Sequence, residues 1–579
     1  MIHSNTENKS ITLPFSQQSS GNHDYIYQCS VKSPFSQTVK IGIAVDDRLD
    51  SLMLNEESIS LDYMQTLYAQ EALDDWKRGY PFDLSLNKGL NTIQVTGNDK
   101  GGKFGFRMAQ SLDYIEYILL FIFGIIPLLF GLYFLIFDLI FESDYKQIPY
   151  KFSWSHLPYF IIVLGIILRI YLLVSVPNTM YQHDFSGHVN AIKHYAEFPF
   201  EIPQADKSLQ FPQQPLYYMS SAIVYSISTA LGFSEYDAIY AVRSMSVFYA
   251  ALWLVLSLAL ARLYLINNFS INIFMAFMAF TPSFIFLGAV VNNDALNAVL
   301  GIWALYEISA YVLNRYPKHF WRASLAVLLA ALTKISSLLF AIYFVVMLLV
   351  MYYQYKDNKV ILKRQILLFG LGVLFIFGFA LLKSHVPANQ EFLFVNSALY
   401  ARQILPTFDL NYFMSFYWFD LIKEGQSYVF GSNTIRYSLP TYFYGTMLSG
   451  EFEIVRYFKA GEYFKIASQL LYVLGIIYVI GFLSYFYFFK RLTRIQKFLL
   501  LPVLINAILI IKFLSDYWVV CNSDFRYFTP VLAAIGLIFV LGLNALKNRY
   551  AWLMKPISII AILLVVIEIY WMVKLIEKT

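Results

Sequence analysis

Apolar and polar residues are distributed very differently before and after about residue 112. Beyond it, long apolar segments recur, such as residues 157–176, LPYFIIVLGIILRIYLLVSV, which contain a single charged side chain. An α-helix rises about 1.5 Å per residue, so a segment of this length crosses the hydrocarbon core of a membrane. The pattern predicts a polytopic α-helical membrane protein of about 12 spans, at residues 114–141, 157–176, 247–265, 271–290, 296–312, 323–335, 338–352, 366–382, 464–488, 499–514, 530–546 and 557–575.

The first 112 residues instead show the two-residue period of half-buried strands, as in KIGIAVDD and NTIQVTG. Turn-forming residues such as Asp46-Asp47 and Asn87-Lys88-Gly89 separate these stretches. We therefore expect an all-β sandwich at residues 1–112 and a membrane domain at residues 113–579. Residues 45–62 and 81–99 resemble the jelly-roll modules of the galactose-binding-like fold. The alternative to carbohydrate binding is a module that only packs on the membrane domain.

Composition agrees with this division. The chain is 58% hydrophobic and only 14% charged, whereas a soluble domain is typically about 25% charged. The net charge of +5 requires no nucleic-acid partner, because basic residues of membrane proteins collect in cytoplasmic loops. Two cysteines, Cys29 and Cys521, are too few for a disulfide framework, which leaves one bridge between them as a minor alternative. The N-terminus has no basic start followed by an apolar core, so no cleavable signal peptide is expected.

Basic residues also predict the orientation. They gather in one set of short loops, which the positive-inside rule makes cytoplasmic: Arg262, Arg315, Lys318, Arg322, Lys356, Lys359, Lys363, Arg364, Lys490, Arg491, Arg494, Lys497, Lys547, Arg549 and Lys555. This holds only if residues 215–233 do not cross, so we interpret them as a juxtamembrane helix with Tyr217 and Tyr218 at the headgroup level.

Four polar segments then share the outer face: a first outer loop at 177–235, the turn at 292–294, a long loop at 383–462 and the loop at 516–526. The β-module is expected on the same face. The alternative is a cytoplasmic module with a segment 114–141 that does not cross fully.

The first outer loop follows a span directly and contains His183, Asp184 and His188. Ionisable groups at the mouth of a membrane span are costly unless they have a purpose. If a helix starts near Asp184, His188 lies one turn later on the same face. Asp184 is the candidate general base and His188 a second catalytic candidate. An N-cap aspartate with a satisfied histidine is the alternative, and a metal site formed by these three residues is not favoured.

Three further charged residues occur at expected outer span ends or within a short span: Asp294, Lys334 and Arg526. Two carboxylates at outer helix starts favour a common site, and cations directed at one cavity suit a phosphate, which arginine binds in a bidentate manner. Each residue also has a structural alternative. Asp294 is at an N-cap position, Lys334 can extend to the interface, and Arg526 can pair with Asp524.

The order of these motifs resembles the GT-C superfamily of integral-membrane glycosyltransferases, which includes protein O-mannosyltransferases, aminoarabinose transferases of lipid A and the RgtA/B/C/D-like branch. The resemblance covers residues 157–364 best and rests on four motifs: His183-Asp184…His188, Gln214-Pro215-Leu216-Tyr217-Tyr218, Asn293-Asp294 and Thr333-Lys334.

The resemblance implies a polyprenyl-phosphate sugar as donor and a lipid, glycan or protein as acceptor. It implies no cofactor, and divalent metal is not favoured. It also implies catalytic roles for Asp184 and Asp294, with His183, Gln214, Tyr217 and Tyr218 as substrate-binding candidates, in a bacterial inner membrane with the site facing the periplasm. The chain departs from the family at Phe185, where an acid is common, and at Gln213-Gln214, where Lys or Glu is common. The donor phosphate is therefore assigned to Lys207, Lys334 and Arg526.

Two other function classes remain open. A transporter or flippase of lipid-linked glycans would show internal repeats and charges near the membrane midplane. We find no clear repeat, and the charged candidates lie at outer span ends. The third class is a non-catalytic envelope assembly protein that displays the β-module.

Overall fold

The computed structural model divides into two compact units, Met1–Ile118 and Leu119–Thr579, which we describe separately. The described residues of the first unit are 2–3, 8–9, 15–19, 23–33, 36–45, 48–59, 80–99 and 102–111. Those of the second are 156–176, 184–199, 201–204, 207–208, 210–354, 359–384, 410–425, 438–450, 462–516 and 524–577. The expected span at 114–141 and the residues His183 and Cys521 lie outside them.

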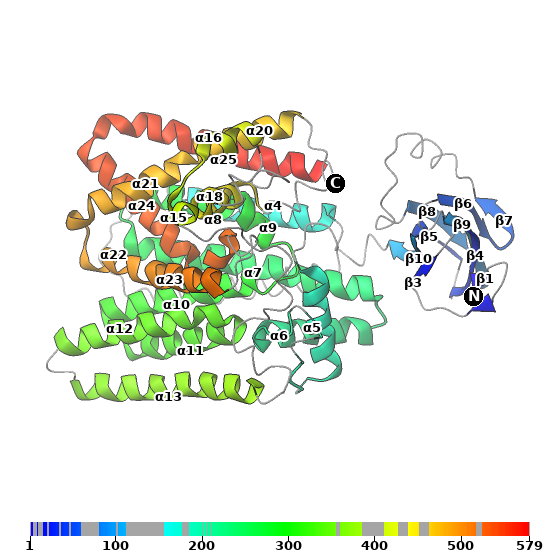
Figure 1. The fold of residues 1–579 in the computed structure, drawn as a ribbon, viewed down its shortest axis with the longest axis horizontal. Helices are drawn as coiled ribbons and strands as arrows, with labels where there is room; N and C mark the ends of the chain where they lie inside the picture. The colour runs from blue at the N-terminus through cyan, green and yellow to red at the C-terminus, as the bar shows by residue number, and fades with distance from the viewer. Residues whose placement is uncertain are drawn as a thin grey trace. The chain divides into compact units, whose positions relative to one another are not determined.

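The N-terminal unit contains two antiparallel sheets (Figure 1). The six-stranded sheet has the order β2-β1-β4-β9-β6-β7, formed by β1 (Ile2–His3), β2 (Asn8–Lys9), β4 (His23–Ser33), β6 (Arg48–Leu54), β7 (Glu57–Ile59) and β9 (Gly89–Asp99). The four-stranded sheet has the order β3-β10-β5-β8, formed by β3 (Phe15–Ser19), β5 (Gln37–Val45), β8 (Tyr80–Leu86) and β10 (Gly102–Ser111). The predicted alternation is visible in β9, where Ile93 and Val95 are buried between partly exposed neighbours.

A buried asparagine joins two turns of this unit. The Asn91 side chain is fully buried, and its Oδ1 accepts hydrogen bonds from Asn55 Nδ2 (3.0 Å) and from the backbone N–H of Asn87 (2.8 Å). Its Nδ2 donates to the Asn87 carbonyl at 2.7 Å. The turn before β9 is thereby connected to the β6–β7 turn, which explains why a polar residue occupies a core position in the motif Gly89-Leu90-Asn91-Thr92-Ile93.

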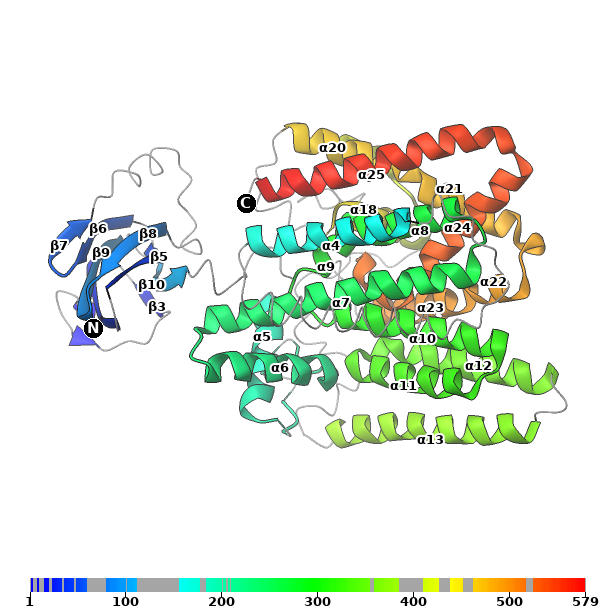
Figure 2. The ribbon, with the colours of Figure 1, turned by 180° about the vertical axis from the view of Figure 1, so that it is seen from behind.

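The second unit is helical (Figures 1 and 2). Its elements up to residue 384 are α4 (Leu157–Ser175), α5 (Phe185–Glu197), α6 (Pro215–Ala230), α7 (Glu235–Tyr264), α8 (Asn268–Phe280), α9 (Pro282–Leu287), α10 (Asp294–Asn314), α11 (Pro317–Thr333), η2 (Ile335–Leu338), α12 (Leu339–Gln354) and α13 (Lys359–Ser384). Those that follow are α15 (Leu410–Met414), α16 (Trp418–Glu424), α18 (Leu439–Ser449), α20 (Glu462–Leu474), α21 (Ile476–Tyr487), η5 (Phe489–Arg491), α22 (Arg494–Phe498), α23 (Leu500–Asp516), η7 (Phe525–Val531), α24 (Leu532–Arg549), η8 (Ala551–Leu553) and α25 (Met554–Glu577).

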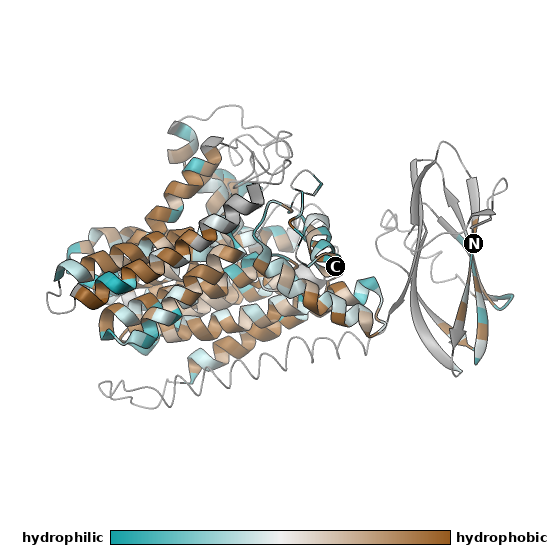
Figure 3. Cartoon of the chain, turned by 90° about the horizontal axis from the view of Figure 1, so that it is seen from below, coloured by the Kyte–Doolittle hydropathy of each residue, from teal (hydrophilic) through white to brown (hydrophobic). Residues whose placement is uncertain are grey.

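Eight helical segments among the described residues are long and apolar enough to cross a membrane: Leu157–Ser175, Glu235–Tyr264, Asp294–Asn314, Ile335–Gln354, Tyr463–Tyr487, Arg494–Leu514, Phe525–Arg549 and Ala551–Lys574. Apolar residues cover most of their length (Figure 3). The chain is therefore a multi-pass helical membrane protein, although eight segments are fewer than the expected 12. The expected span at 271–290 is interrupted, because Pro282 has no N–H to continue α8 and a second helix, α9, begins there. The one at 323–335 corresponds to α11, which has 17 residues.

Helix α6 is not one of the described helices that are long and apolar enough to cross a membrane. It packs against α5 and against α7, and both views show it beside the first half of α7 (Figures 1 and 2). Helix α7 leads away from the end of the bundle where α5 starts, and α8 and α9 together lead back to it. Helix α10 therefore starts near the start of α5. A third crossing between these two helix starts would place them at opposite ends. This geometry agrees with the interpretation of residues 215–233 as a helix beside the spans.

Two fully buried arginines hold the helix ends around this region. Arg169 in α4 donates hydrogen bonds to the carbonyls of Ala279 (2.9 Å) and Phe284 (3.2 Å), on either side of the break between α8 and α9. Arg243 in α7 donates to the carbonyls of Val176, at the end of α4, and Ala289 (2.6 Å for Nε to Ala289 O). Many carbonyls at helix ends lack intrahelical partners, so the arginines supply donors there and fix the turn that leads into α10.

Candidate active site

Asp184 starts helix α5 in an unusual backbone conformation. Its φ of 53° and ψ of 25° lie in the left-handed region, which few non-glycine residues adopt. Asp184 occupies the N-cap position, as the alternative interpretation expects, but its side chain makes no capping hydrogen bond. Instead, Asp184 Oδ2 lies 3.6 Å from Nη2 of Arg526. A strained residue that does not cap its own helix is typical of a functional position.

His188 is buried one turn later, as predicted, and contacts a tyrosine. Its Nδ1 lies 3.0 Å from the hydroxyl of Tyr218, and the two rings stack at 5.8 Å. Tyr218 donates to Gln210 Oε1 at 3.5 Å. Because an amide oxygen can only accept, the donor in the shorter contact is His188 Nδ1–H. Burial lowers the pKa of His188 to about 4, so this imidazole is neutral at pH 7.

Tyr217 and Tyr218 are 0% and 1% exposed, so neither ring reaches the surface of the unit, and their expected position at the headgroup level stays a prediction. Both belong to the first turn of α6 and face the protein interior, where their rings contact His188. Burial raises the pKa of Tyr218 well above its ordinary value. The adjacent candidate Gln214 is also buried, at the N-cap of α6, and its side chain does not cap the helix. The Gln-Pro-Leu-Tyr-Tyr motif therefore forms an inner wall beside α5.

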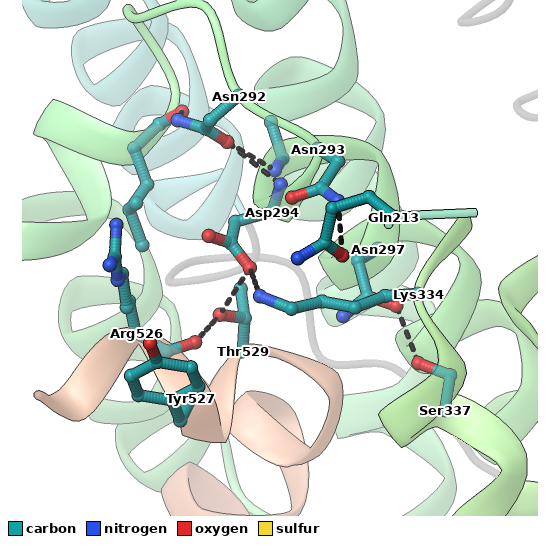
Figure 4. Close-up of polar contacts among 12 residues, drawn as sticks. Gln213, Asn292, Asn293, Asp294, Asn297, Lys334, Ser337, Arg526, Tyr527 and Thr529 are labelled. Atoms are coloured by element: carbon teal, nitrogen blue, oxygen red, sulfur yellow. Dashed lines mark hydrogen bonds and ion pairs between the residues drawn. The ribbon is translucent and has the colours of Figure 1, made fainter. Parts of the chain in front are cut away.

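Asp294 is the first residue of α10. Because Asn292 caps this helix, the Asp294 carboxylate can contact side chains of other elements. Asn292 Oδ1 accepts from the backbone N–H groups of Asp294 (2.8 Å) and Ala295 (3.1 Å). Asp294 Oδ1 accepts from Lys334 Nζ at 2.6 Å and from Thr529 Oγ1 at 3.3 Å (Figure 4). The alternative of Asp294 as the capping residue is therefore wrong.

Lys334 lies at the end of α11 and points into the bundle rather than to an interface. Its side chain is 13% exposed, its ammonium group pairs with Asp294, and it lies 5.4 Å from the ring centre of Tyr527. The alternative that Lys334 extends to the membrane surface is thus wrong. A buried ammonium group needs such a partner, because its desolvation is costly.

Arg526 belongs to the 3₁₀-helix η7 and is connected to two acids in different ways. Its guanidinium faces Asp184 at 3.6 Å, and its backbone N–H donates to Asp524 Oδ1 at 2.8 Å. Its guanidinium carbon also lies 5.4 Å from the ring centre of Tyr527. Pairing with Asp524 therefore involves the backbone of Arg526, while its side chain reaches the start of α5.

Close packing of α10 against η7 brings these groups together. Gly301 in α10 lies against the carbonyl of Pro530, and an added Cβ would lie 3.1 Å from a ring carbon of Phe340 as well. Asn293 Nδ2 donates to Gln213 Oε1 at 3.4 Å, which connects the start of α10 to the residue before the α6 motif (Figure 4). Residues far apart in the sequence thus meet at one end of the bundle.

An open cavity with an empty volume of about 440 Å³ lies beside this cluster. Its polar lining includes Asn292, Asp294, Asp524 and Arg526, and its apolar lining comes from the segment that contains α9: Phe286, Leu287 and Val290. Ser283, Thr446 and Gly450 complete it. The lining is therefore amphipathic, because it contains both charged and apolar side chains.

The structure brings together most of the predicted site residues, but not all of them. Lys207 is exposed in the turn before α6, and no contact between its side chain and the cluster is found in the described part of the chain. The described residues contain no group of three or more His, Cys, Asp or Glu side chains that could hold a metal ion. Cys29 is a free thiol.

Other contributors carry no recognisable sequence signal. Thr529, Tyr527 and Gln210 are common residue types in positions where only the fold gives them a role. Asp524 was foreseen only as a partner of Arg526, although its position two residues before an arginine at a span start could have suggested a third acid. No family model and no curated protein matches the chain.

Proposed function

We propose that the protein is a membrane glycosyltransferase of the GT-C type, which transfers a sugar from a polyprenyl-phosphate donor to a lipid, glycan or protein acceptor. One observation carries this proposal. Asp184, Asp294, Lys334 and Arg526 come from four separate segments and meet beside an amphipathic cavity. The charges suit a phosphate and a hydroxyl nucleophile, and the apolar lining suits a substrate with a lipid tail.

The leaving group of such a reaction is a polyprenyl phosphate, so cations that face its oxygens lower the barrier to transfer. Arg526 and Lys334 are the candidates, because both are largely buried at the cavity end of the bundle. Each is already balanced by a carboxylate, so a bound phosphate would compete with Asp184 for Arg526 and with Asp294 for Lys334. Release of Asp184 from Arg526 leaves this carboxylate able to accept the proton of the acceptor hydroxyl as general base.

The finer architecture belongs to the same proposal. We propose about 12 spans, with the shorter helices α11 and α8–α9 among them, and a sandwich of the galactose-binding-like type for the N-terminal sheets. The basic loops support an orientation in which the site faces the outside, and the resemblance to the GT-C superfamily suggests a bacterial cytoplasmic membrane. The β-module is assigned to the same face.

Sugar transfer by the purified full-length protein in lipid nanodiscs tests the proposal, with polyprenyl-phosphate sugars as donors and membrane lipid extracts as acceptors. Asp184→Asn keeps the shape and removes the basicity, so turnover should fall by about 10²- to 10⁴-fold. The KM for donor should not rise, because the same change removes the anion that competes for Arg526. Asp420→Asn, at a partly exposed carboxylate in α16, is the matched control and should retain wild-type turnover.

Three results would contradict the proposal or its assignment of the base. Wild-type turnover by Asp184→Asn rules out Asp184 as the base. If the wild-type protein consumes no polyprenyl-phosphate sugar but moves a lipid-linked glycan between the leaflets of vesicles, it is a transporter. If it neither transfers sugar nor moves a lipid-linked glycan, the result favours a non-catalytic assembly protein.

A further inference from the structure

Asp524 has one carboxylate oxygen without a hydrogen-bond partner. The side chain is 4% exposed and lines the cavity together with Arg526 and Asp294. Its Oδ1 accepts the backbone N–H of Arg526 at 2.8 Å. Its Oδ2 is buried and has no hydrogen-bond partner among the described residues. Asp524 therefore belongs to the cavity wall, with one carboxylate oxygen held by the backbone and the other buried without a donor.

The other two carboxylates of the site differ in this respect. Asp294 pairs with Lys334 at 2.6 Å, and Asp184 faces Arg526 at 3.6 Å. Asp524, by contrast, is fixed through the backbone only, and burial raises its pKa above the ordinary range of an aspartate. A carboxylate that is buried but not neutralised by its own close ion pair costs stability.

Buried polar atoms in native proteins nearly always have a partner, so each exception calls for an explanation. An unmade hydrogen bond at a buried acceptor lowers the stability of the folded protein. If Asp524 served only to accept the backbone N–H of Arg526 through Oδ1, asparagine could replace it without loss. A bound group that donates a hydrogen bond to Oδ2 accounts for both the burial and the free oxygen.

The position of Asp524 beside Arg526 limits the chemistry of this group. The two residues belong to one turn, so a phosphate held by the Arg526 guanidinium lies next to the Asp524 carboxylate. In a phosphosugar, the atoms adjacent to the phosphate are those of the sugar ring, whose hydroxyl groups are hydrogen-bond donors. We infer that Asp524 Oδ2 accepts a hydrogen bond from a hydroxyl group of the donor sugar, an inference that rests on the proposed function.

The test compares binding of bare polyprenyl phosphate with binding of polyprenyl-phosphate mannose, glucose and galactose to the full-length protein in nanodiscs. The wild type should bind at least one of the three sugar-bearing donors more tightly than bare polyprenyl phosphate. Asp524→Asn should lower the affinity for that donor by about 10- to 150-fold, the range for the loss of a hydrogen bond to a charged group. Its affinity for bare polyprenyl phosphate should stay the same, and its Tm should not fall, because the change removes a buried charge.

Arg526→Gln is the comparison variant and should weaken the bare phosphate and the sugar-bearing donor alike. Equal losses for both probes in Asp524→Asn would overturn the inference, because Asp524 would then act only by positioning Arg526. Unchanged affinities for all probes in Asp524→Asn would overturn the inference as well, because Oδ2 would then bind only water. An effect confined to the KM of the acceptor would also overturn it. If the wild type binds no polyprenyl phosphate at all, the proposed function itself fails.

Discussion

The buried cations of the site are paired with acids that lie far away in the sequence. Lys334 contacts Asp294, 40 residues earlier, and Arg526 faces Asp184 from a different helix start. Residue type alone indicates that a buried ammonium or guanidinium group needs an acid, but it cannot say which acid. In the proposed reaction the pairing matters, because the acid that leaves its cation when phosphate binds is the one that becomes available as a base.

Stability should fall as the pH is lowered from 7 to 5 because of His188. Burial lowers the pKa of this histidine from 6.5 to about 4, so the unfolded chain binds a proton in this interval and the folded protein does not. The free energy of unfolding therefore decreases by about 2 kcal/mol, at about 1.4 kcal/mol per pH unit. Thermal unfolding in detergent at pH 5 and pH 7, for wild type and His188→Gln, measures this contribution as the difference between the two pH slopes.

Asp524 has the opposite effect, because burial raises its pKa and stability then falls as the pH rises. The comparison between wild type and His188→Gln removes this contribution, since both proteins contain Asp524. An identical slope in His188→Gln would show that His188 titrates normally in the folded protein.

At the scale of elements, helix starts and close contacts between helices position the site. Asn292 caps α10 and so leaves Asp294 for Lys334. The sequence Asn-Asn-Asp predicts a capped helix start but not which of the three residues caps. Similarly, a glycine in a membrane helix does not reveal whether another backbone lies against it, whereas the structure shows the Pro530 carbonyl at Gly301.

Gly301→Ala should separate η7 from α10. The added Cβ would collide with the Pro530 carbonyl, and a shift of η7 moves Thr529 and Arg526 away from Asp294. We expect a loss of about 1–3 kcal/mol in the free energy of unfolding, as for other overpacked sites, and a larger loss of sugar transfer. Thermal unfolding and transfer assays measure the two effects.

Gly370→Ala in α13 is the matched control, because nothing lies within 4 Å of its added Cβ. Alanine also favours a helix over glycine by about 1 kcal/mol, so this variant should be at least as stable as wild type. Equal behaviour of the two variants would contradict the proposed role of the contact at Gly301.

At the scale of the whole molecule, the positive-inside rule and the bundle connectivity lead to one topology. Residues at the cluster end, such as Lys207, should face the outside, while Lys318, which precedes His319 near the start of α11, should face the cytoplasm. The N-terminal unit is assigned to the outside by the same rule, since the structure leaves its position relative to the bundle open.

Cysteine labelling in intact cells tests this topology. Single cysteines at Lys207, Ser58 and Lys318, all exposed within their units, are introduced into a chain with Cys29 and Cys521 replaced by serine. A membrane-impermeant maleimide should label the first two before permeabilisation and the third only afterwards. Protection of the Ser58 position alone would place the β-module in the cytoplasm, and labelling of the Lys318 position in intact cells would reverse the bundle.

The amino-acid sequence by itself determined the class of protein and the identity of most site residues. Apolar runs predicted a multi-pass helical membrane protein, and eight of the expected spans coincide with described helices that are long and apolar enough to cross a membrane. Period-two alternation predicted the strands of the N-terminal unit. These features depend on local hydrophobicity and on the fixed repeat of helix and strand, which each short segment carries in its own residues.

Only the tertiary structure decided how these residues act together. It paired Lys334 with Asp294 and Arg526 with Asp184, turned Tyr217 and Tyr218 inward, and left Lys207 outside the cluster. The physical reason is that a partner for a buried charge comes from whichever segment packs against it, and packing depends on contacts between residues up to several hundred positions apart. The free oxygen of Asp524 follows from the same packing, because burial removes water without supplying a donor.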